Sequence, residues 1–139
     1  MNNQIPLSSR IYDSLFKAKE TVDNEYQEAL DWITDIIENA ERPKAKECEI
    51  CSSNKKLELH HVRGCENGNE VITACHECHV KLTAKQRLWY PSCHDINTEN
   101  NDAYLIRGLI DICESKYQKT GKEIFKRFAE KLTEGFSYE

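Results

Sequence analysis

The amino-acid sequence predicts an α+β fold in which a β-hairpin and one helix form a small core between two helical arms. Apolar residues recur at helical spacing near both ends of the chain, within residues 8–40 and 99–135. Between these arms, two short runs of strand length flank a loop that contains two glycines and two asparagines. Because 139 residues suffice for one compact hydrophobic core, residues 1–139 are expected to form a single domain.

Residues 8–40 form the expected N-terminal helical arm. Its apolar residues lie mainly three, four or seven positions apart: Ile11, Leu15, Val22, Tyr26, Ala29, Leu30, Ile33 and Ile37. Asp23 and Asn24 are good N-cap residues, so the arm is predicted to divide into two helices at this point. Residues 1–40 carry three Lys/Arg against eight Asp/Glu, which gives the arm an acidic solvent-facing side.

The central core is expected within residues 45–90. Leu57 to Val62 and Val71 to Ala74 are predicted to be the two strands, and the turn-rich loop between them joins them as a hairpin. A helix is expected to begin after Cys75 and to stop before Pro91. Its predicted packing side consists of Val80, Leu82, Ala84 and Leu88.

The C-terminal arm, residues 99–135, is predicted to contain two helices that pack on the core. The first is marked by Ala103, Ile106, Leu109, Ile110 and Cys113, and the second by Ile124, Phe125, Phe128, Ala129 and Leu132. Thr120 and Glu123 have the spacing of a reciprocal capping box at the start of the second helix, and Gly135 is placed to end it. Cys113 lies on the apolar face and is expected to be a buried core thiol.

Four of the seven cysteines form two Cys-x-x-Cys pairs, which are Cys48 with Cys51 and Cys75 with Cys78. Each pair turns tightly enough to offer two thiolates to one ion, and four thiolates complete a closed tetrahedral zinc site. The sequence therefore predicts one structural Zn²⁺. The alternative is a site of three cysteines and one histidine, with His76 or His79 as the fourth ligand. Accessory metal contacts by Cys65 or by Cys93 with His94 are less expected, because these residues lack the paired spacing.

Composition also bears on compartment and partners. The first ten residues are polar and no run of about 18 apolar residues occurs, so neither an export signal nor a membrane span is expected. Paired cysteines in such a chain indicate metal binding in a reducing, cytoplasmic setting rather than disulfides. The net charge of −5 argues against nucleic acid, but residues 41–90 carry nine Lys/Arg against seven Asp/Glu. The central segment is therefore locally basic.

The central motifs resemble those of the HNH endonucleases, which have the ββα-metal fold. The resemblance covers roughly residues 45–90 and rests on Cys48-x-x-Cys51, Leu59-His60-His61-Val62, a glycine-bearing loop and Cys75-His76-Glu77-Cys78-His79. It implies cleavage of phosphodiester bonds in nucleic acid, with DNA as the expected substrate, His61 as general base, and His60 and His79 as ligands of a catalytic ion. That ion would be Mg²⁺ or a transition-metal divalent ion, separate from the structural zinc.

The residue chemistry agrees with these implied roles. An imidazole can take a proton from water near pH 7, and a divalent ion can stabilise charge on a phosphate. Successive strand residues face opposite sides, so His60 and His61 are expected to act separately. The chain departs from the family at Glu70, which stands where the family has its middle asparagine. Either Asn67 or Asn69 takes that role after a shift of the loop, or Glu70 orients His61 as a carboxylate, or the site is weak or inactive.

Four basic residues flank the proposed site and are candidate phosphate contacts: Arg63, Lys81, Lys85 and Arg87. The simpler interpretation is that they are solvated surface residues. Two other functions remain open. In one, the zinc-stapled fold is a catalytically inactive module that binds nucleic acid or protein, with the acidic arms recruiting a partner or a second copy. In the other, His60, His61 and His79 bind a second structural zinc.

Overall fold

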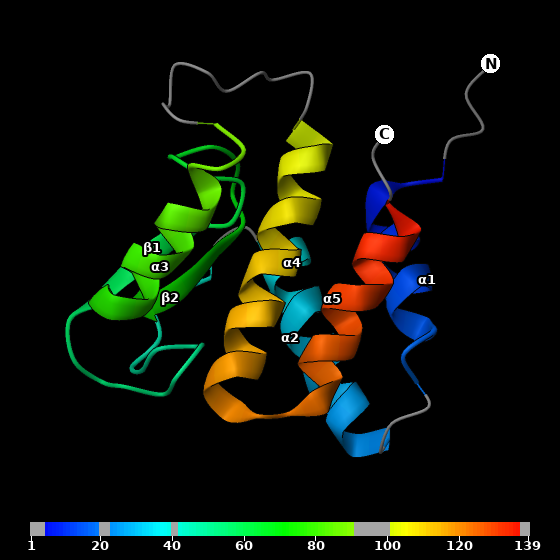
Figure 1. Ribbon diagram of the computed structural model, residues 1–139, viewed down its shortest axis with the longest axis horizontal. Helices are drawn as coiled ribbons and strands as arrows, with labels where there is room; N and C mark the ends of the chain where they lie inside the picture. Colours follow the sequence, from blue (N-terminus) through cyan, green and yellow to red (C-terminus); the bar gives the residue numbers. More distant parts are fainter. Residues whose placement is uncertain (1–4, 20–22, 40–41, 91–100, 137–139) are drawn as a thin grey trace.

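The computed structural model of the chain describes residues 5–19, 23–39, 42–90 and 101–136, and it has the predicted α+β architecture. Its described elements are α1 (Leu7–Phe16), α2 (Asp23–Glu38), β1 (Leu57–His61), β2 (Val71–Cys75), α3 (His76–Gln86), α4 (Asn101–Thr120) and α5 (Glu123–Gly135). Figure 1 shows the hairpin and α3 on one side of α4, with α5 and α1 on the other. α4 is thus the central helix that joins the two halves.

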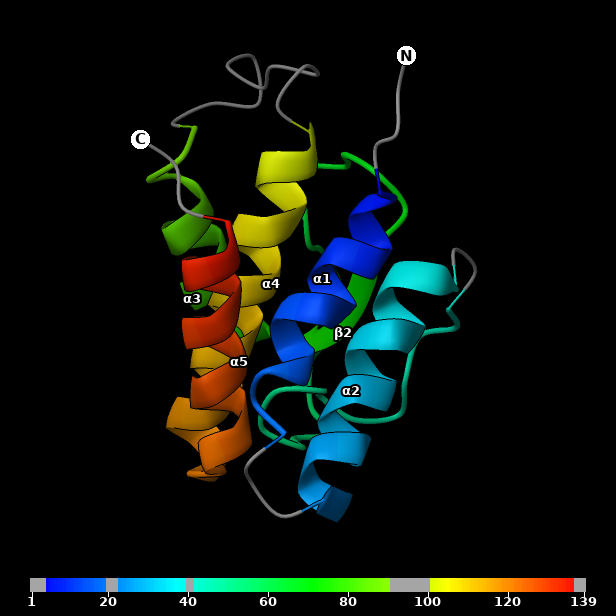
Figure 2. The same ribbon diagram turned by 90° about the vertical axis from the view of Figure 1, so that its right-hand side faces the viewer.

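The N-terminal arm divides where the sequence predicted, because α1 ends at Phe16 and α2 begins at Asp23. The two helices lie side by side in Figure 2, and both pack on α5. In α2 the fully buried isoleucines are Ile33 and Ile36, whereas Ile37, which the periodicity had selected, is only partly buried. Val22, another predicted core residue, lies outside the described residues.

The junction between the two C-terminal helices differs from the predicted capping box. α4 continues through Thr120, whose hydroxyl donates to the Lys116 carbonyl at 2.7 Å and accepts from the Lys122 amide at 3.2 Å. The N-cap of α5 is Lys122, which makes no side-chain cap. Thr120 therefore ends α4 instead of starting α5, because its hydroxyl is already bonded within its own last turn. The prediction that α5 ends at Gly135 is confirmed.

One continuous hydrophobic core joins the arms to the hairpin. Its largest fully buried side chains are Phe128, Ile11, Leu15, Ile33, Ile36, Ile50, Ile72, Leu82, Leu105, Ile106, Leu109 and Ile112. Cys113 is completely buried among them, which confirms its predicted role as a core thiol. Among the described helices, none combines the length and the apolar character needed to cross a bilayer.

The central segment forms the predicted hairpin and helix. β1 and β2 are antiparallel, with His60 opposite Ile72, and α3 packs against both strands. Of the predicted packing side, Leu82 is buried as expected, but Val80 and Leu88 are 53% and 85% exposed and Ala84 is exposed. Leu82 shares its buried face with Cys78 and Gln86, which lie four positions before and after it. Pro91, the predicted helix stop, lies outside the described residues.

Candidate functional site

The four predicted zinc ligands come together at the base of the hairpin. Cys48 and Cys51 lie in the turn before β1, Cys75 ends β2, and Cys78 is in the first turn of α3. Their sulfur atoms all lie within 4.8 Å of one another. The Cys51 and Cys75 sulfurs are 3.7 Å apart, close to the roughly 3.8 Å edge of a tetrahedron with Zn–S bonds of about 2.3 Å. The donor set and its spacing therefore fit a closed zinc site.

The thiols of this cluster differ in how readily they lose a proton. Burial by itself would raise the pKa of Cys48, but hydrogen bonds from backbone amides, including those of Cys51 and Ile50 at 3.4 Å, outweigh it and lower that pKa. Burial and the neighbouring sulfurs raise the pKa of Cys78. Four clustered thiolates cannot coexist without a positive ion, so zinc binding must release protons. Among the described residues, this is the one group of three or more possible ligands with metal-site spacing.

A polar clasp that the sequence did not reveal holds the zinc turn against β2. Glu49, between the first two cysteines, accepts from the Thr73 amide at 2.6 Å and from the guanidinium of Arg42. Arg42 also donates to the Val71 carbonyl at 2.7 Å and to Asp35 of α2 at 2.7 Å. The clasp ties the zinc turn, the hairpin and the N-terminal arm together. No local pattern marks it, because Arg42 and Thr73 are far apart in the sequence.

His60 and His79, the two predicted ligands of the catalytic ion, lie against each other. Their ring centroids are 5.4 Å apart and the rings meet edge to face. His60 is 2% exposed, and burial, followed by the nearby His79 and His61, lowers the pKa of His60 to about 3. His60 is therefore neutral at physiological pH, which is the form of imidazole that binds metals.

Two further side chains hold this histidine pair in place. Glu58 accepts from Nδ1 of His79 at 2.6 Å, and the hydrogen bonds from His79 and His76 lower the pKa of the Glu58 carboxyl. Gln86 places its amide nitrogen 3.2 Å from Nε2 of His60 and 2.9 Å from the His61 carbonyl. An ion at Nε2 of His60 would replace that bond from Gln86. Neither Glu58 nor Gln86 was singled out from the sequence, although Glu58 is two residues before His60 on the same side of β1.

The structure does not bring the side chains of His61 and Glu70 together through any interaction among the described residues. Glu70 instead forms a bidentate pair with Arg63, accepting from its Nε at 2.7 Å and from its Nη2 at 3.2 Å. Asn67, a candidate for the role of the missing asparagine, donates to the side chain of Asn101 at 2.8 Å. His61 is half-buried and, by strand alternation, faces the other side of β1 from His60. These bonds hold the loop between β1 and β2 in place. Among the described hydrogen bonds and ion pairs, none orients the His61 ring.

The candidate phosphate contacts differ in availability. Arg63 is 15% exposed and engaged with Glu70, so its guanidinium is committed to the loop. Lys81 lies 3.3 Å from Glu77, which also contacts Lys119 of α4 at 3.3 Å. Lys85 and Arg87 complete the set; Lys85 pairs with Glu114 at 3.7 Å, and Arg87 is exposed. Lys81, Lys85 and Lys119 line a groove of about 290 Å³ between α3 and α4, on a different face of α3 from His79.

Cys65 is disulfide-bonded, so it is not an accessory metal ligand, and the expectation of metal binding rather than disulfides does not hold for this residue. Cys93 and His94 lie outside the described residues.

Comparison with known proteins leaves the family open. No protein-family model, no curated protein and no solved structure matches the chain. The site must therefore be interpreted from its own geometry.

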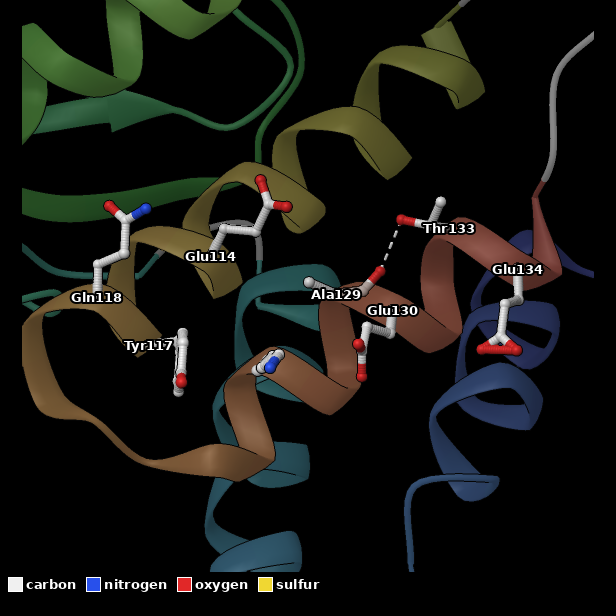
Figure 3. A pocket seen from close by; sticks show the side chains of 8 residues that line it. Glu114, Tyr117, Gln118, Ala129, Glu130, Thr133 and Glu134 are labelled. Carbon is white, nitrogen blue, oxygen red and sulfur yellow. Dashed lines mark hydrogen bonds between the residues drawn. The ribbon is translucent and has the colours of Figure 1, made fainter.

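A larger groove of about 750 Å³ lies away from the cysteines and histidines, between α4 and α5. Figure 3 shows Glu114, Tyr117 and Gln118 on its α4 wall and Ala129, Glu130, Thr133 and Glu134 on its α5 wall. Lys126 also lines it. The groove thus belongs to the C-terminal arm and contains no candidate ligand of the metal site.

Proposed function

We propose that the chain is a metal-dependent endonuclease of the HNH type, with Zn²⁺ at the four cysteines and a second divalent ion at His60 and His79. The observation that carries this proposal is the edge-to-face contact of these two histidines, at 5.4 Å between centroids, on a hairpin and helix joined by the cysteine cluster. An imidazole from each element is suited to hold one ion between them.

In phosphodiester hydrolysis, the ion-binding histidines and the general base would have separate roles. His60 and His79 would hold an ion that, when bound, would supply positive charge to the phosphate and to the leaving oxygen. His61, which is half-buried and not committed to the His60–His79 pair, takes a proton from the attacking water. Its carbonyl bond to Gln86 fixes the backbone at the end of β1.

The test of this division of roles is a nicking assay on supercoiled plasmid with Mg²⁺, Mn²⁺, Ni²⁺ or Zn²⁺. His61→Ala should reduce cleavage by about 10²–10⁴-fold while leaving ion affinity near normal. His79→Ala should weaken ion binding, and a higher metal concentration should restore part of its activity.

His60→Ala should also lower stability, because His60 is 2% exposed and its removal leaves a cavity. Melting temperature and zinc content are therefore measured in parallel. Loss of the zinc-stapled fold in both His60→Ala and His79→Ala would instead favour a second structural zinc at these histidines.

Nucleic acid, with DNA as the expected form, is proposed to contact the basic side of α3. Charge reversal of Lys81, Lys85 and Arg87 to Glu should weaken DNA binding and reduce the slope of log K against log salt by about 0.9 for each phosphate that the protein no longer neutralises. Lys126→Glu, in the acidic groove, is the matched control and should leave the slope unchanged. An unchanged slope in the α3 variant would move the contact surface elsewhere.

A second candidate function is a binding module without catalysis, since the Glu70 carboxylate is paired with Arg63 and, among the described residues, makes no hydrogen bond or ion pair with His61. The groove of Figure 3 favours protein binding, because three glutamates and the apolar faces of Tyr117 and Ala129 line it. Its occupant would be a basic segment of a partner or of a second copy of this chain. A wild-type protein that binds DNA but never nicks it under any of the four metals would favour this function.

A further inference from the structure

The Glu58 carboxylate lies between two histidines of α3. Its Oε1 is 2.6 Å from Nδ1 of His79, and its Oε2 is 3.0 Å from Nδ1 of His76. The two histidines are three positions apart and therefore share one side of the first helical turn. Glu58 and His60 are two positions apart on β1, so their side chains lie on the same side of the strand, and both point toward α3. One carboxylate from the hairpin thus contacts two imidazoles of the helix and lies beside the histidine pair.

These contacts fix which ring nitrogen carries the proton. An ionised carboxylate can only accept hydrogen bonds, so Nδ1 of each histidine must donate. In a neutral imidazole with its proton on Nδ1, the lone pair available to an ion is on Nε2. Histidines that bind metals are commonly held in this way by a carboxylate, which sets both the tautomer and the direction of the ring.

A contribution to stability does not account for this arrangement. The side chains of Glu58 and His76 are 39% and 59% exposed, and that of His79 is 31% exposed. Ion pairs and hydrogen bonds at such exposure contribute little to folding, because water competes for both partners. Their effect is on ring orientation, which matters only if His79 has something to bind.

We infer that Glu58 is a positioning residue that holds His79 with its proton on Nδ1 and presents Nε2 to an ion shared with His60. His76 occupies the second carboxylate oxygen and restrains the rotation of Glu58. This inference rests on the proposed ion site, but the orientation of His79 is open to measurement without any ion.

The first experiment reads the tautomer of each histidine from long-range ¹H–¹⁵N NMR spectra of the zinc-loaded full chain. In the wild type with neutral imidazole rings, His79 should show a protonated Nδ1 and an unprotonated Nε2. Glu58→Ala should give a mixture of tautomers at His79, whereas Glu77→Ala should not. Glu77 is the matched control, because it is an exposed carboxylate on the same helical turn that pairs with Lys81 and Lys119. An unchanged His79 tautomer in Glu58→Ala would overturn the inference.

The second experiment titrates Ni²⁺ into the same zinc-loaded proteins by calorimetry. Glu58→Ala should weaken Ni²⁺ binding by about 10–100-fold, the usual effect of removing such a carboxylate, and His76→Ala should have a smaller effect. Glu58→Gln keeps an accepting oxygen for only one of the two rings. Its Ni²⁺ affinity should therefore lie between those of Glu58→Ala and His76→Ala. Equal weakening in Glu58→Ala and Glu77→Ala would reduce the effect to general charge and overturn the inference.

The two experiments separate the inference from the proposed function. A wild type that binds no Ni²⁺ overturns the ion site and with it the proposed endonuclease. A wild type that binds Ni²⁺ only as tightly as Glu58→Ala overturns only the role of Glu58. Zinc content and melting temperature are compared across all variants, and Glu58→Gln remains as the milder substitution if Glu58→Ala does not fold.

Discussion

Removal of the zinc site should unfold one half of the molecule and leave the other half helical. The perturbation is the double substitution Cys48→Ser and Cys51→Ser, which deletes two of the four clustered sulfurs. Structural zinc contributes roughly 10–16 kcal/mol of apparent binding free energy in small zinc domains, against a total stability of about 5–15 kcal/mol for a typical domain. The hairpin has only two strands, and such a hairpin is at best marginally stable alone. It should therefore not persist without zinc.

The size of the spectroscopic change follows from where the helices lie. α3 has 11 residues and is the one described helix that supplies a zinc ligand, whereas α4 alone has 20. The other helices share apolar contacts of their own, such as the edge-to-face pair of Tyr26 and Phe128 at 5.9 Å. Most of the far-ultraviolet circular dichroism should therefore remain in the double variant.

Hydrogen exchange with mass spectrometry is the deciding measurement. Amides of residues 48–90 should lose protection in the double variant, while those of α4 and α5 should keep most of theirs. Cys113→Ala is the control, because it removes a thiol from the core without touching the zinc cluster. An unaltered thermal transition in the double variant would refute the structural role of zinc. Loss of nearly all helical signal would refute the independence of the helical arms.

Two further predictions concern stability. Gly108→Ala should destabilise the chain by about 1–3 kcal/mol in urea unfolding, because a new Cβ would lie 1.9 Å from the Val62 carbonyl oxygen; a stabilised variant would mean that helix propensity outweighs this approach. Burial raises the pKa of Asp111 to about 6 from 3.8, so its contribution to stability is fully present below pH 3.8 and is lost as the pH rises through 6. Asp111→Asn keeps an acceptor for Trp89. Its free energy of unfolding should exceed that of the wild type by on the order of 2 kcal/mol at pH 7.5 and differ little at pH 4. Unfolding free energies that depend equally on pH in the two proteins would contradict this.

The elements of the fold could be predicted because their signals are local. The break before Asp23, the hairpin turn and the end of α5 at Gly135 each depend on a few adjacent residues. The predictions that were wrong concern competition between local options. The Thr120 hydroxyl could bond within its own helix or cap the next one. In the structure it donates to the Lys116 carbonyl, four residues before it in α4.

The candidate site was predictable only where residue type is itself specific. Paired cysteines and adjacent histidines carry recognisable chemistry, and the structure brings together the four cysteines and the pair of His60 and His79. Glutamates and glutamines are common surface residues, so nothing in the sequence distinguishes Glu58 or Gln86 from their neighbours. Their roles depend on which strand residue faces which helix residue, and that is decided by the register of the hairpin and the packing of α3.

His60 belongs both to the buried interior and to the proposed ion site. A buried position on a strand would ordinarily take an aliphatic residue, because burying an imidazole requires a hydrogen-bond partner for each of its polar atoms. The Gln86 amide that meets Nε2 of His60 at 3.2 Å also donates to the His61 carbonyl at 2.9 Å. If an ion replaced the Gln86 amide at Nε2 of His60, Gln86 would therefore still donate to the His61 carbonyl. A leucine at position 60 would avoid the cost of burying a polar ring and could bind no ion, so the proposed ion site would account for an imidazole at this buried position.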